Sequence, residues 1–273
     1  MDGNRYRLIT FDMDGTLLDS GKRILPDSIR AMDEAAAAGK IICLSTGRCM
    51  PEIQGYLSEA GSISYVIGAS GGFIYDVYKG EYIYTNPIPP AIVLEMLSRV
   101  EGRDVQLVYM TEKAYTQRDC VPRMPEFNVE EFQALYETSY ILPEDMIAFY
   151  RADPFDCFKI NVFNLSVREQ NEVAESYADL PLEVVYAGKT SLECTVKGAT
   201  KGTGFRKLCE LLGIPVAQTI AVGDSDNDLP VLNEAGLSVA MGNSNANVLR
   251  TCDVTVADND SGGCAEAIRR FLI

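Results

Sequence analysis

Two aspartates near the start of the chain, Asp12 and Asp14, are spaced for chemistry. They follow the apolar run Leu8–Phe11, which predicts a short buried strand, and Gly15-Thr16 then turns the chain away. Residues two apart on an extended segment project to the same side, so the two carboxylates share one space and repel each other. A bound cation, or a reaction in which a carboxylate is the nucleophile, would account for the pair. An Asp-Gly turn with a local cap is the structural alternative.

A second acidic group lies towards the other end of the chain. Asp224, Asn227 and Asp228 follow the apolar run Thr219–Val222. In open parallel sheets ligands bind beyond the carboxyl ends of the strands, so the two acidic groups could meet there and share one divalent ion. Mg²⁺ prefers oxygen ligands, typically carboxylates together with water and substrate phosphate. Acidic residues at a helix N-terminus are also favourable in themselves, which is the alternative interpretation.

Two further segments could bind phosphate. Ser45-Thr46-Gly47-Arg48 ends a predicted strand and precedes a helix, where a hydroxyl and backbone N–H groups can hold phosphate oxygens. The same residues could simply cap the helix. Lys201 stands at a predicted helix start, where a cation opposes the helix dipole and needs another reason to be present. Neutralising the acidic groups and a phosphate would supply that reason, and a solvated lysine is the alternative.

Composition excludes several classes of function. The 273 residues include no histidine, which removes Ser-His and Cys-His nucleophile pairs and disfavours a Cys/His zinc site. A net charge of −15 argues against a nucleic-acid partner. No apolar stretch approaches about 18 residues, so we expect no membrane span. The eight cysteines are scattered along the chain, and we expect no secretory signal peptide. The sequence therefore predicts reduced thiols in a cytoplasmic protein.

The order of elements predicts an α/β fold with a doubly wound parallel sheet and an inserted α+β unit. Strands at 8–11, 41–44 and 65–68 alternate with helices at 26–38 and from 51, which is typical of parallel strands with right-handed crossovers. From about 88 to 186 the pattern becomes helix, two strands, helix, strand, helix and strand. Alternation resumes with a helix at 201–212. We therefore predict a core of residues 1–85 and 187–273 and an inserted domain of residues 86–186.

Taken in order, the four polar segments resemble those of the haloacid dehalogenase superfamily of aspartate-nucleophile phosphohydrolases. They are Asp12-Met13-Asp14-Gly15-Thr16, Ser45-Thr46-Gly47-Arg48, Lys201-Gly202 and Gly223-Asp224-Ser225-Asp226-Asn227-Asp228. The insertion between the second and third segments is similar to the large α/β cap, type IIB, of the Cof-type subfamily. The resemblance covers the whole chain and implies a Rossmann-like core with an inserted cap.

The resemblance also implies roles for the acidic residues and the lysine. Asp12 would be the nucleophile and a ligand of Mg²⁺. Asp14 would be the general acid and base, with its backbone carbonyl on the metal. Asp224 would bind Mg²⁺ directly with support from Asp228, and Lys201 would hold both the phosphate and Asp12.

The remaining candidate residues would bind the substrate. Thr46 or Ser45 would hydrogen-bond the phosphate, and Gly47 would lend a backbone N–H. Asn227 would support the phosphate, and Arg48 is expected near the cap and the substrate. 

One segment departs from the family pattern. Relatives usually carry Asn-Gly after the third strand, whereas this chain has Ala69-Ser70-Gly71, so no role for Ser70 follows from the resemblance. On a predicted cap strand, Lys159 and Asn161 are candidates for substrate specificity or ordinary residues of a surface strand.

The sequence thus predicts a Mg²⁺-dependent phosphomonoester hydrolase that acts through an aspartyl-phosphate on a small phosphorylated metabolite. A sugar phosphate is the default substrate for such caps. A phosphomutase with the same nucleophile is the close alternative, and a non-catalytic phosphoacceptor or binding protein is the alternative from another class. No oligomeric state is predicted.

Overall fold

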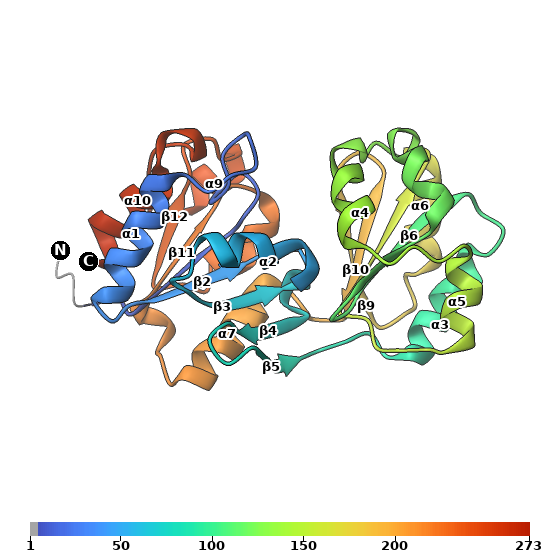
Figure 1. The fold of residues 1–273 in the computed structure, drawn as a ribbon, viewed down its shortest axis with the longest axis horizontal. Coiled ribbons are helices and arrows are strands. Elements are labelled where there is room, and N and C mark those ends of the chain that lie inside the picture. Colours follow the sequence, from blue (N-terminus) through green and yellow to red (C-terminus); the bar gives the residue numbers. More distant parts are fainter. Residues whose placement is uncertain (1–4) are drawn as a thin grey trace. The chain divides into compact units, whose positions relative to one another are not determined.

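The computed structural model describes residues 5–273, which form two compact units (Figure 1). The first unit, here the core unit, comprises the chain up to Gly47 together with Gln54–Tyr84 and Thr200–Ile273. The second, the cap unit, comprises Arg48–Ile53 and Thr85–Ala199. The helix α2 (Met50–Glu59) therefore begins in the cap unit and ends in the core unit.

A mostly parallel sheet forms the centre of the core unit. In sheet order its strands are β13 (Val254–Thr255), β12 (Leu237–Ala240), β11 (Thr219–Gly223), β1 (Leu8–Phe11), β2 (Ile41–Ser45), β3 (Ile63–Gly68), β4 (Phe73–Asp76) and β5 (Glu81–Thr85). The central strand β1 pairs in parallel with both β11 and β2, so that Phe11 lies between Val222 and Leu44. The carboxyl ends of these three strands consequently meet at one edge of the sheet.

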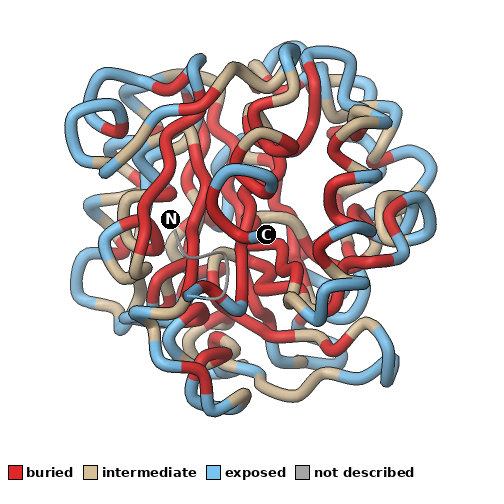
Figure 2. The backbone as a smooth tube through the Cα atoms, turned by 90° about the vertical axis from the view of Figure 1, so that its left-hand side faces the viewer, coloured by how far each residue is buried: buried red, intermediate tan, exposed pale blue. Residues whose placement is uncertain are grey.

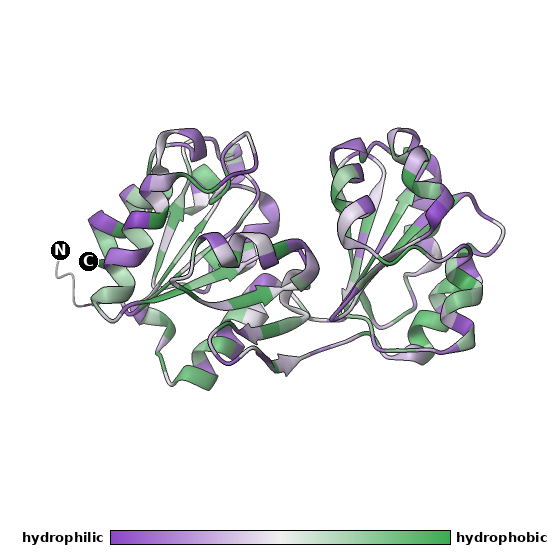
Figure 3. Ribbon diagram, in the orientation of Figure 1, coloured by the Kyte–Doolittle hydropathy of each residue, from purple (hydrophilic) through white to green (hydrophobic). Residues whose placement is uncertain are grey.

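Helices cover this sheet because each has one apolar face. They are α1 (Pro26–Ala37), α7 (Lys201–Leu212), α8 (Leu229–Leu232), α9 (Ala246–Thr251) and α10 (Gly263–Ala267). Phe205 and Leu208 of α7 pack against Leu8, Cys43 and Ile67 of the sheet. The central strands β1, β2, β3, β11 and β12 are almost entirely buried, and the strands of the sheet are largely apolar (Figures 2 and 3). The parallel sheet with covering helices confirms the predicted fold class.

The cap unit is built on an antiparallel sheet. Its order is β7 (Ala114–Thr116), β6 (Val105–Met110), β8 (Lys159–Asn164), β10 (Ser191–Val196) and β9 (Leu182–Ala187). One face packs on α3 (Pro90–Val100), α5 (Met146–Ala152) and α6 (Val167–Ser176). The other face meets the 3₁₀ segment η2 (Arg118–Phe127) and α4 (Gln133–Ser139). 

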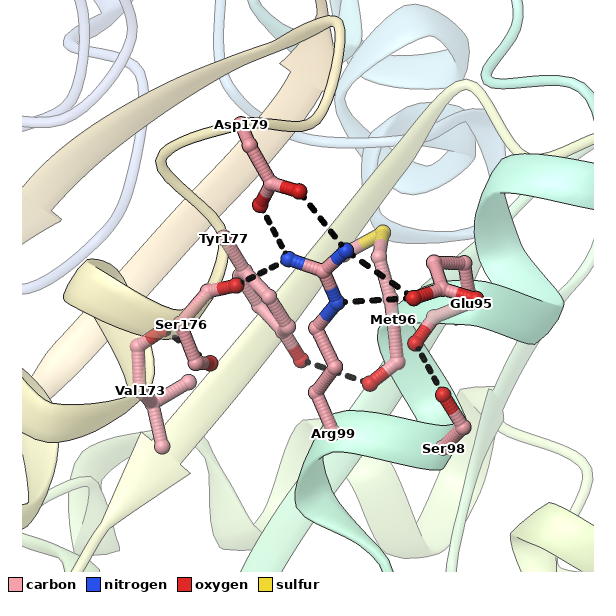
Figure 4. Close-up of polar contacts among 8 residues, drawn as sticks. All are labelled: Glu95, Met96, Ser98, Arg99, Val173, Ser176, Tyr177 and Asp179. Atoms are coloured by element: carbon pink, nitrogen blue, oxygen red, sulfur yellow. Dashed lines mark hydrogen bonds and ion pairs between the residues drawn. The ribbon is translucent and has the colours of Figure 1, made fainter.

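Arg99 joins two of the cap helices (Figure 4). Its guanidinium, in the last turn of α3, pairs with the Asp179 carboxylate and donates to the carbonyl of Ser176, the last residue of α6. A cation at a helix C-terminus also interacts favourably with the helix dipole. Nearby, the buried Tyr177 hydroxyl donates to the Met96 carbonyl over 3.3 Å. These contacts fix α3 against α6.

All eight cysteines are free thiols, and seven of them are buried. Within residues 5–273, every helix is too short or too polar to cross a membrane.

Candidate active site

Asp12 and Lys201 form a buried ion pair at the carboxyl edge of the core sheet. Asp12 follows β1 directly, and its backbone N–H donates to the Val222 carbonyl of β11 over 3.0 Å. The Lys201 ammonium lies 2.6 Å from Asp12 Oδ1 and 2.7 Å from Asp228 Oδ1. Asp12 is 6% exposed and Lys201 2% exposed, so both charges are withdrawn from water.

The position of Lys201 depends on how helix α7 begins. Thr200 caps the helix: its hydroxyl accepts from the Thr203 N–H at 3.1 Å, and the Thr203 hydroxyl accepts from the Thr200 N–H at 2.9 Å. Lys201 is the first residue of the helix, directly after the N-cap Thr200. Gly202 follows, where a Cβ would lie 2.4 Å from the Pro230 carbonyl oxygen, so only glycine permits this approach of α7 to α8.

Asp224 and Asp228 complete an acidic cluster around this pair. One carboxylate oxygen from each of Asp12, Asp224 and Asp228 lies within 4.8 Å of the others. Both carboxylate oxygens of Asp228 accept hydrogen bonds within the protein. Oδ1 accepts from Lys201, and Oδ2 accepts from the backbone N–H groups of Asp224 and Ser225. Asp224 Oδ1 accepts from the Thr16 hydroxyl at 2.8 Å. 

Burial sets the ionisation of the cluster. The pKa of Asp12 is raised to about 7, mainly by burial. The charge of Lys201 opposes this rise, and the carboxylates of Asp228 and Asp224 add to it. Burial likewise raises the pKa of Asp224 to about 6, although the Thr16 hydroxyl opposes this shift. Burial alone would lower the pKa of Lys201, but the two carboxylates raise it above its ordinary value. The two carboxylates thus favour the charged form of Lys201.

The cluster fits a hard divalent cation. Three carboxylates surround one ammonium, which leaves negative charge that a second cation would offset. Asp12 Oδ2 and Asp224 Oδ2 accept no hydrogen bond from the described residues, and an all-oxygen donor set is the one that Mg²⁺ prefers. Gly15 keeps the space beside Asp224 open, since a Cβ there would lie 2.7 Å from Asp224 Oδ2.

Asp14 lies outside this cluster. Its side chain is 38% exposed, and Oδ1 accepts from the Lys22 ammonium at 2.7 Å. Lys22 has a φ of 58°, in the left-handed region that non-glycine residues seldom adopt. The turn that holds it is closed by the Asp19 carboxylate, which accepts from the Arg23 N–H.

The Ser45–Gly47 loop lies at the carboxyl end of β2, next to β1. Ser45 Oγ is buried and has no hydrogen-bond partner. The Thr46 N–H donates to Ile67 of β3, and the Thr46 carbonyl accepts from the Ser70 N–H over 3.0 Å. Ser70 itself has a φ of 56°, a conformation for which Asn is favoured over Ser. The segment after β3 therefore supports this loop through its backbone.

Two further predicted residues are Asn227 and Arg48. Asn227 is exposed, and its Oδ1 accepts from the Ser225 hydroxyl at 2.7 Å. Arg48 belongs to the cap unit, whereas the loop that precedes it belongs to the core unit.

Sequence reasoning missed two supports of the cluster. Thr16, which orients Asp224, lies in the first acidic segment but has no predicted role. Asn243 donates to the Gly15 carbonyl at 2.8 Å and so fixes the turn after Asp14. Its place in Val239-Ala240-Met241-Gly242-Asn243, directly after a strand, is a signal that could have identified it.

The carboxylates and the buried lysine gather at the carboxyl ends of the parallel strands, where sheets of this kind bind ligands. A family model for haloacid dehalogenase-like hydrolases matches residues 9–268. The chain therefore belongs to the haloacid dehalogenase-like hydrolases, as the resemblance of its four segments predicted, and is a phosphatase of that family.

Three comparisons illustrate the relationship. The chain is 28% identical over 266 residues to "Putative phosphatase YkrA" of Bacillus subtilis, with 97% of both chains covered. It is 26% identical to the B. subtilis "5-amino-6-(5-phospho-D-ribitylamino)uracil phosphatase YcsE", over 98% of this chain and 96% of the relative. The solved structure of the subclass IIB sugar phosphatase BT4131 shares 25% identity and a TM-score of 0.80, over 96% of this chain and 98% of that one.

Proposed function

We propose that this protein is a Mg²⁺-dependent phosphomonoester hydrolase that acts through an aspartyl-phosphate formed on Asp12. The observation that carries the proposal is the buried Lys201–Asp12 pair, 2.6 Å long, beside the carboxylates of Asp224 and Asp228. A buried carboxylate whose charge is held by a fixed ammonium is a nucleophile that needs no histidine base, and the chain has none.

The metal would be held by Asp12, Asp224 and the backbone carbonyl of Asp14. When bound, Mg²⁺ supplies positive charge that offsets the negative charge of the phosphoryl group and of the cluster. Asp228, with both oxygens engaged, supports the loop around Asp224 rather than contributing a free ligand.

The reaction would proceed in two halves. An Asp12 carboxylate oxygen forms a bond to phosphorus as the ester P–O bond breaks, and Asp14 gives its proton to the departing alkoxide. Asp14 then takes a proton from water, whose oxygen forms a bond to phosphorus as the bond between phosphorus and the Asp12 oxygen breaks. This step releases orthophosphate and regenerates the Asp12 carboxylate. Such acid–base assistance is worth about 10²–10⁴-fold. The ion pair with Lys22 holds Asp14 in the unreacted state, so this contact has to open before Asp14 protonates the leaving group.

The phosphate would be held by the Ser45–Gly47 loop and by Lys201. The unpartnered buried hydroxyl of Ser45 supports this, because a buried donor without a partner is costly and a phosphate oxygen would satisfy it. Thr46 and the Gly47 N–H are proposed to contribute as well. Contacts of Arg48 and Asn227 with the substrate stay predictions.

The substrate is proposed to be a small phosphorylated metabolite, in the first place a sugar phosphate. BT4131 is named as a sugar phosphatase and YcsE as acting on a phosphoribitylamino compound, so both relatives are named for hydroxylated phosphate esters. The net charge of −15 is consistent with a small substrate rather than a nucleic acid. A cytoplasmic location stays a prediction.

A phosphate-release screen over sugar phosphates and phosphorylated cofactors, with Mg²⁺ present, tests the proposal. We expect orthophosphate release by the natural protein and loss of at least about 10³-fold in Asp12→Asn, which removes the nucleophile. Asp33→Asn, an exposed change on α1, is the matched control and should keep full activity. An isomerised product without free phosphate would show a mutase instead, and a stable phosphoprotein without turnover would show a phosphoacceptor.

A further inference from the structure

The turn at 15–18, directly after the second predicted catalytic aspartate, is bonded to a distant part of the chain. The Asn243 amide donates to the Gly15 carbonyl at 2.8 Å. The Asn259 amide donates to the Leu18 carbonyl at 2.9 Å. These contacts span sequence separations of 228 and 241 residues, so the C-terminal region holds both ends of the turn.

The two asparagines, here the asparagine pair, are also joined to each other. Asn243 Oδ1 accepts from the Asn259 backbone N–H at 3.1 Å, so both polar atoms of the Asn243 side chain are engaged. One residue further on, the Asp260 carboxylate accepts from the Ser20 N–H at 2.7 Å. The segment after Asp14 is therefore held at three points by one connected set of residues.

Burial of the core does not explain these contacts. Asn243 and Asp260 are exposed, and Asn259 is half-buried. Hydrogen bonds of exposed groups contribute little net stability, because water competes for both partners. Gly15, to which Asn243 is bonded, has a φ of 83°, in the left-handed region. The asparagine pair therefore selects one conformation of the turn among those that a glycine allows.

The backbone of this turn decides where the Asp14 carboxyl can reach. In the unreacted state Asp14 is paired with Lys22, and this contact has to open before the reaction. A side chain that changes its partner is located by its own backbone. On one side that backbone follows Asp12, whose N–H is bonded to β11, and on the other side it precedes Gly15. Fixing the Gly15 carbonyl thus completes the positioning of Asp14.

We propose that Asn243 and Asn259 are positioning residues for Asp14. They keep the Asp14 carboxyl within reach of the departing alkoxide in the first half-reaction and of the attacking water in the second, although they touch neither. Without them the turn would sample other conformations, and part of the acid–base assistance of about 10²–10⁴-fold would be lost. The proposal rests on the proposed phosphatase function and names residues that control its proton transfers.

Kinetics with two leaving groups, at saturating Mg²⁺, test the assignment in Asn243→Ala and Asn259→Ala. An alkoxide leaves with a proton from Asp14, whereas p-nitrophenolate is stable enough to leave without one. We expect kcat/KM to fall about 10-fold for the best sugar phosphate of the screen and to change by less than about 2-fold for p-nitrophenyl phosphate. Asn233→Ala, at the exposed C-cap of α8, is the matched control and should change neither value.

A double substitution separates positioning from a general structural effect. Asp14→Asn removes the acid, so adding Asn243→Ala to it should lower kcat/KM by less than about 2-fold further. A further fall of about 10-fold in that background, equal falls with both esters, or no fall with either ester overturns the proposal. Thermal unfolding checks that each variant keeps its fold.

Hydrogen exchange tests the contacts without turnover. In the metal-free protein, peptides covering residues 13–20 should exchange at least about 5-fold faster in Asn243→Ala and Asn259→Ala than in the natural protein, whereas peptides from β11 should not change. Equal exchange contradicts the role of the asparagine pair, whatever the outcome of the phosphate-release screen. Absence of phosphate release together with faster exchange contradicts the phosphatase assignment, and with it the role of Asp14, while confirming the contacts.

Discussion

At the scale of single residues, the site depends on the two ion pairs that the Lys201 ammonium forms with buried carboxylates. The ammonium lies 2.6 Å from Asp12 and 2.7 Å from Asp228, and all three side chains are at most 7% exposed. Removing one member of a buried ion group leaves an uncompensated charge. This lowers the free energy of unfolding by far more than the intact group contributes to it. We therefore expect the lysine to stabilise the fold in addition to its proposed role in phosphate binding.

Replacement of this lysine, Lys201→Met, should lower the free energy of unfolding by about 3–5 kcal/mol and abolish turnover. The destabilisation should be smaller at pH 5 than at pH 8, because Asp12 loses its counterion and takes up a proton more readily at lower pH. Urea denaturation at the two pH values measures this.

Lys207→Met, on the same helix but half-exposed, is the control and should change stability by less than about 0.5 kcal/mol. Equal losses in the two variants would contradict the role given to Lys201.

At the scale of elements, helix starts and tight turns place the charged groups. The Thr200–Thr203 capping box fixes the first turn of α7, and the close contact between Gly202 and Pro230 brings α7 against α8. The loop that carries Asp224 and Asp228 precedes α8 directly. The distance from Lys201 to Asp228 is thus set by the packing of two helices.

Gly202→Ala should push these helices apart, because its Cβ would lie 2.4 Å from the Pro230 carbonyl oxygen. We expect a loss of about 1–3 kcal/mol in stability and a fall in kcat, since the Lys201–Asp228 contact is displaced. Gly55→Ala in α2, where a Cβ meets nothing within 4 Å, is the matched control. It should be neutral or stabilising by up to about 1 kcal/mol. Thermal unfolding and phosphate release on both variants decide the matter; no difference between them would refute the packing argument.

At the scale of the whole molecule, the acidic cluster links stability to pH and to metal. The pKa of Asp12 is raised to about 7 and that of Asp224 to about 6 from an ordinary value of 3.8. The folded state then binds more protons than the unfolded state between about pH 4 and 7. Metal-free protein should therefore lose stability through these two groups as the pH rises across that window.

Mg²⁺ should reverse this loss, because it binds the deprotonated carboxylates. At 100 times its Kd it should add about 2.7 kcal/mol to stability. Thermal unfolding with EDTA or with Mg²⁺, at pH 5.0 and 7.5, measures the effect, which should be larger at the higher pH. Asp224→Asn should remove most of it. An Mg²⁺ effect that is independent of pH would argue against a carboxylate site.

Several elements follow from local sequence alone. The predicted helix at 26–38 is α1 (Pro26–Ala37), and the predicted strand at 41–44 is β2 (Ile41–Ser45). The long 3₁₀ segment η2 (Arg118–Phe127) was not predicted: Pro122 and Pro125 remove backbone donors and prevent a regular α-helix. Strand β10 (Ser191–Val196) was also missed, since its pairing with β8 and β9 decides its conformation.

The sequence by itself determined the chemistry available to this protein: acids at two strand ends, a lysine at a helix start and no histidine. These are local patterns, and local backbone preferences are enough to specify them. Only the tertiary structure decided which acids meet. Because β1 pairs in parallel with β11, Asp12 comes beside Asp224. Asp228 accepts hydrogen bonds from Lys201 and from two backbone N–H groups, and Asn227 is left exposed. Strand pairing over more than 200 residues depends on burial of the entire sheet, which no short segment encodes.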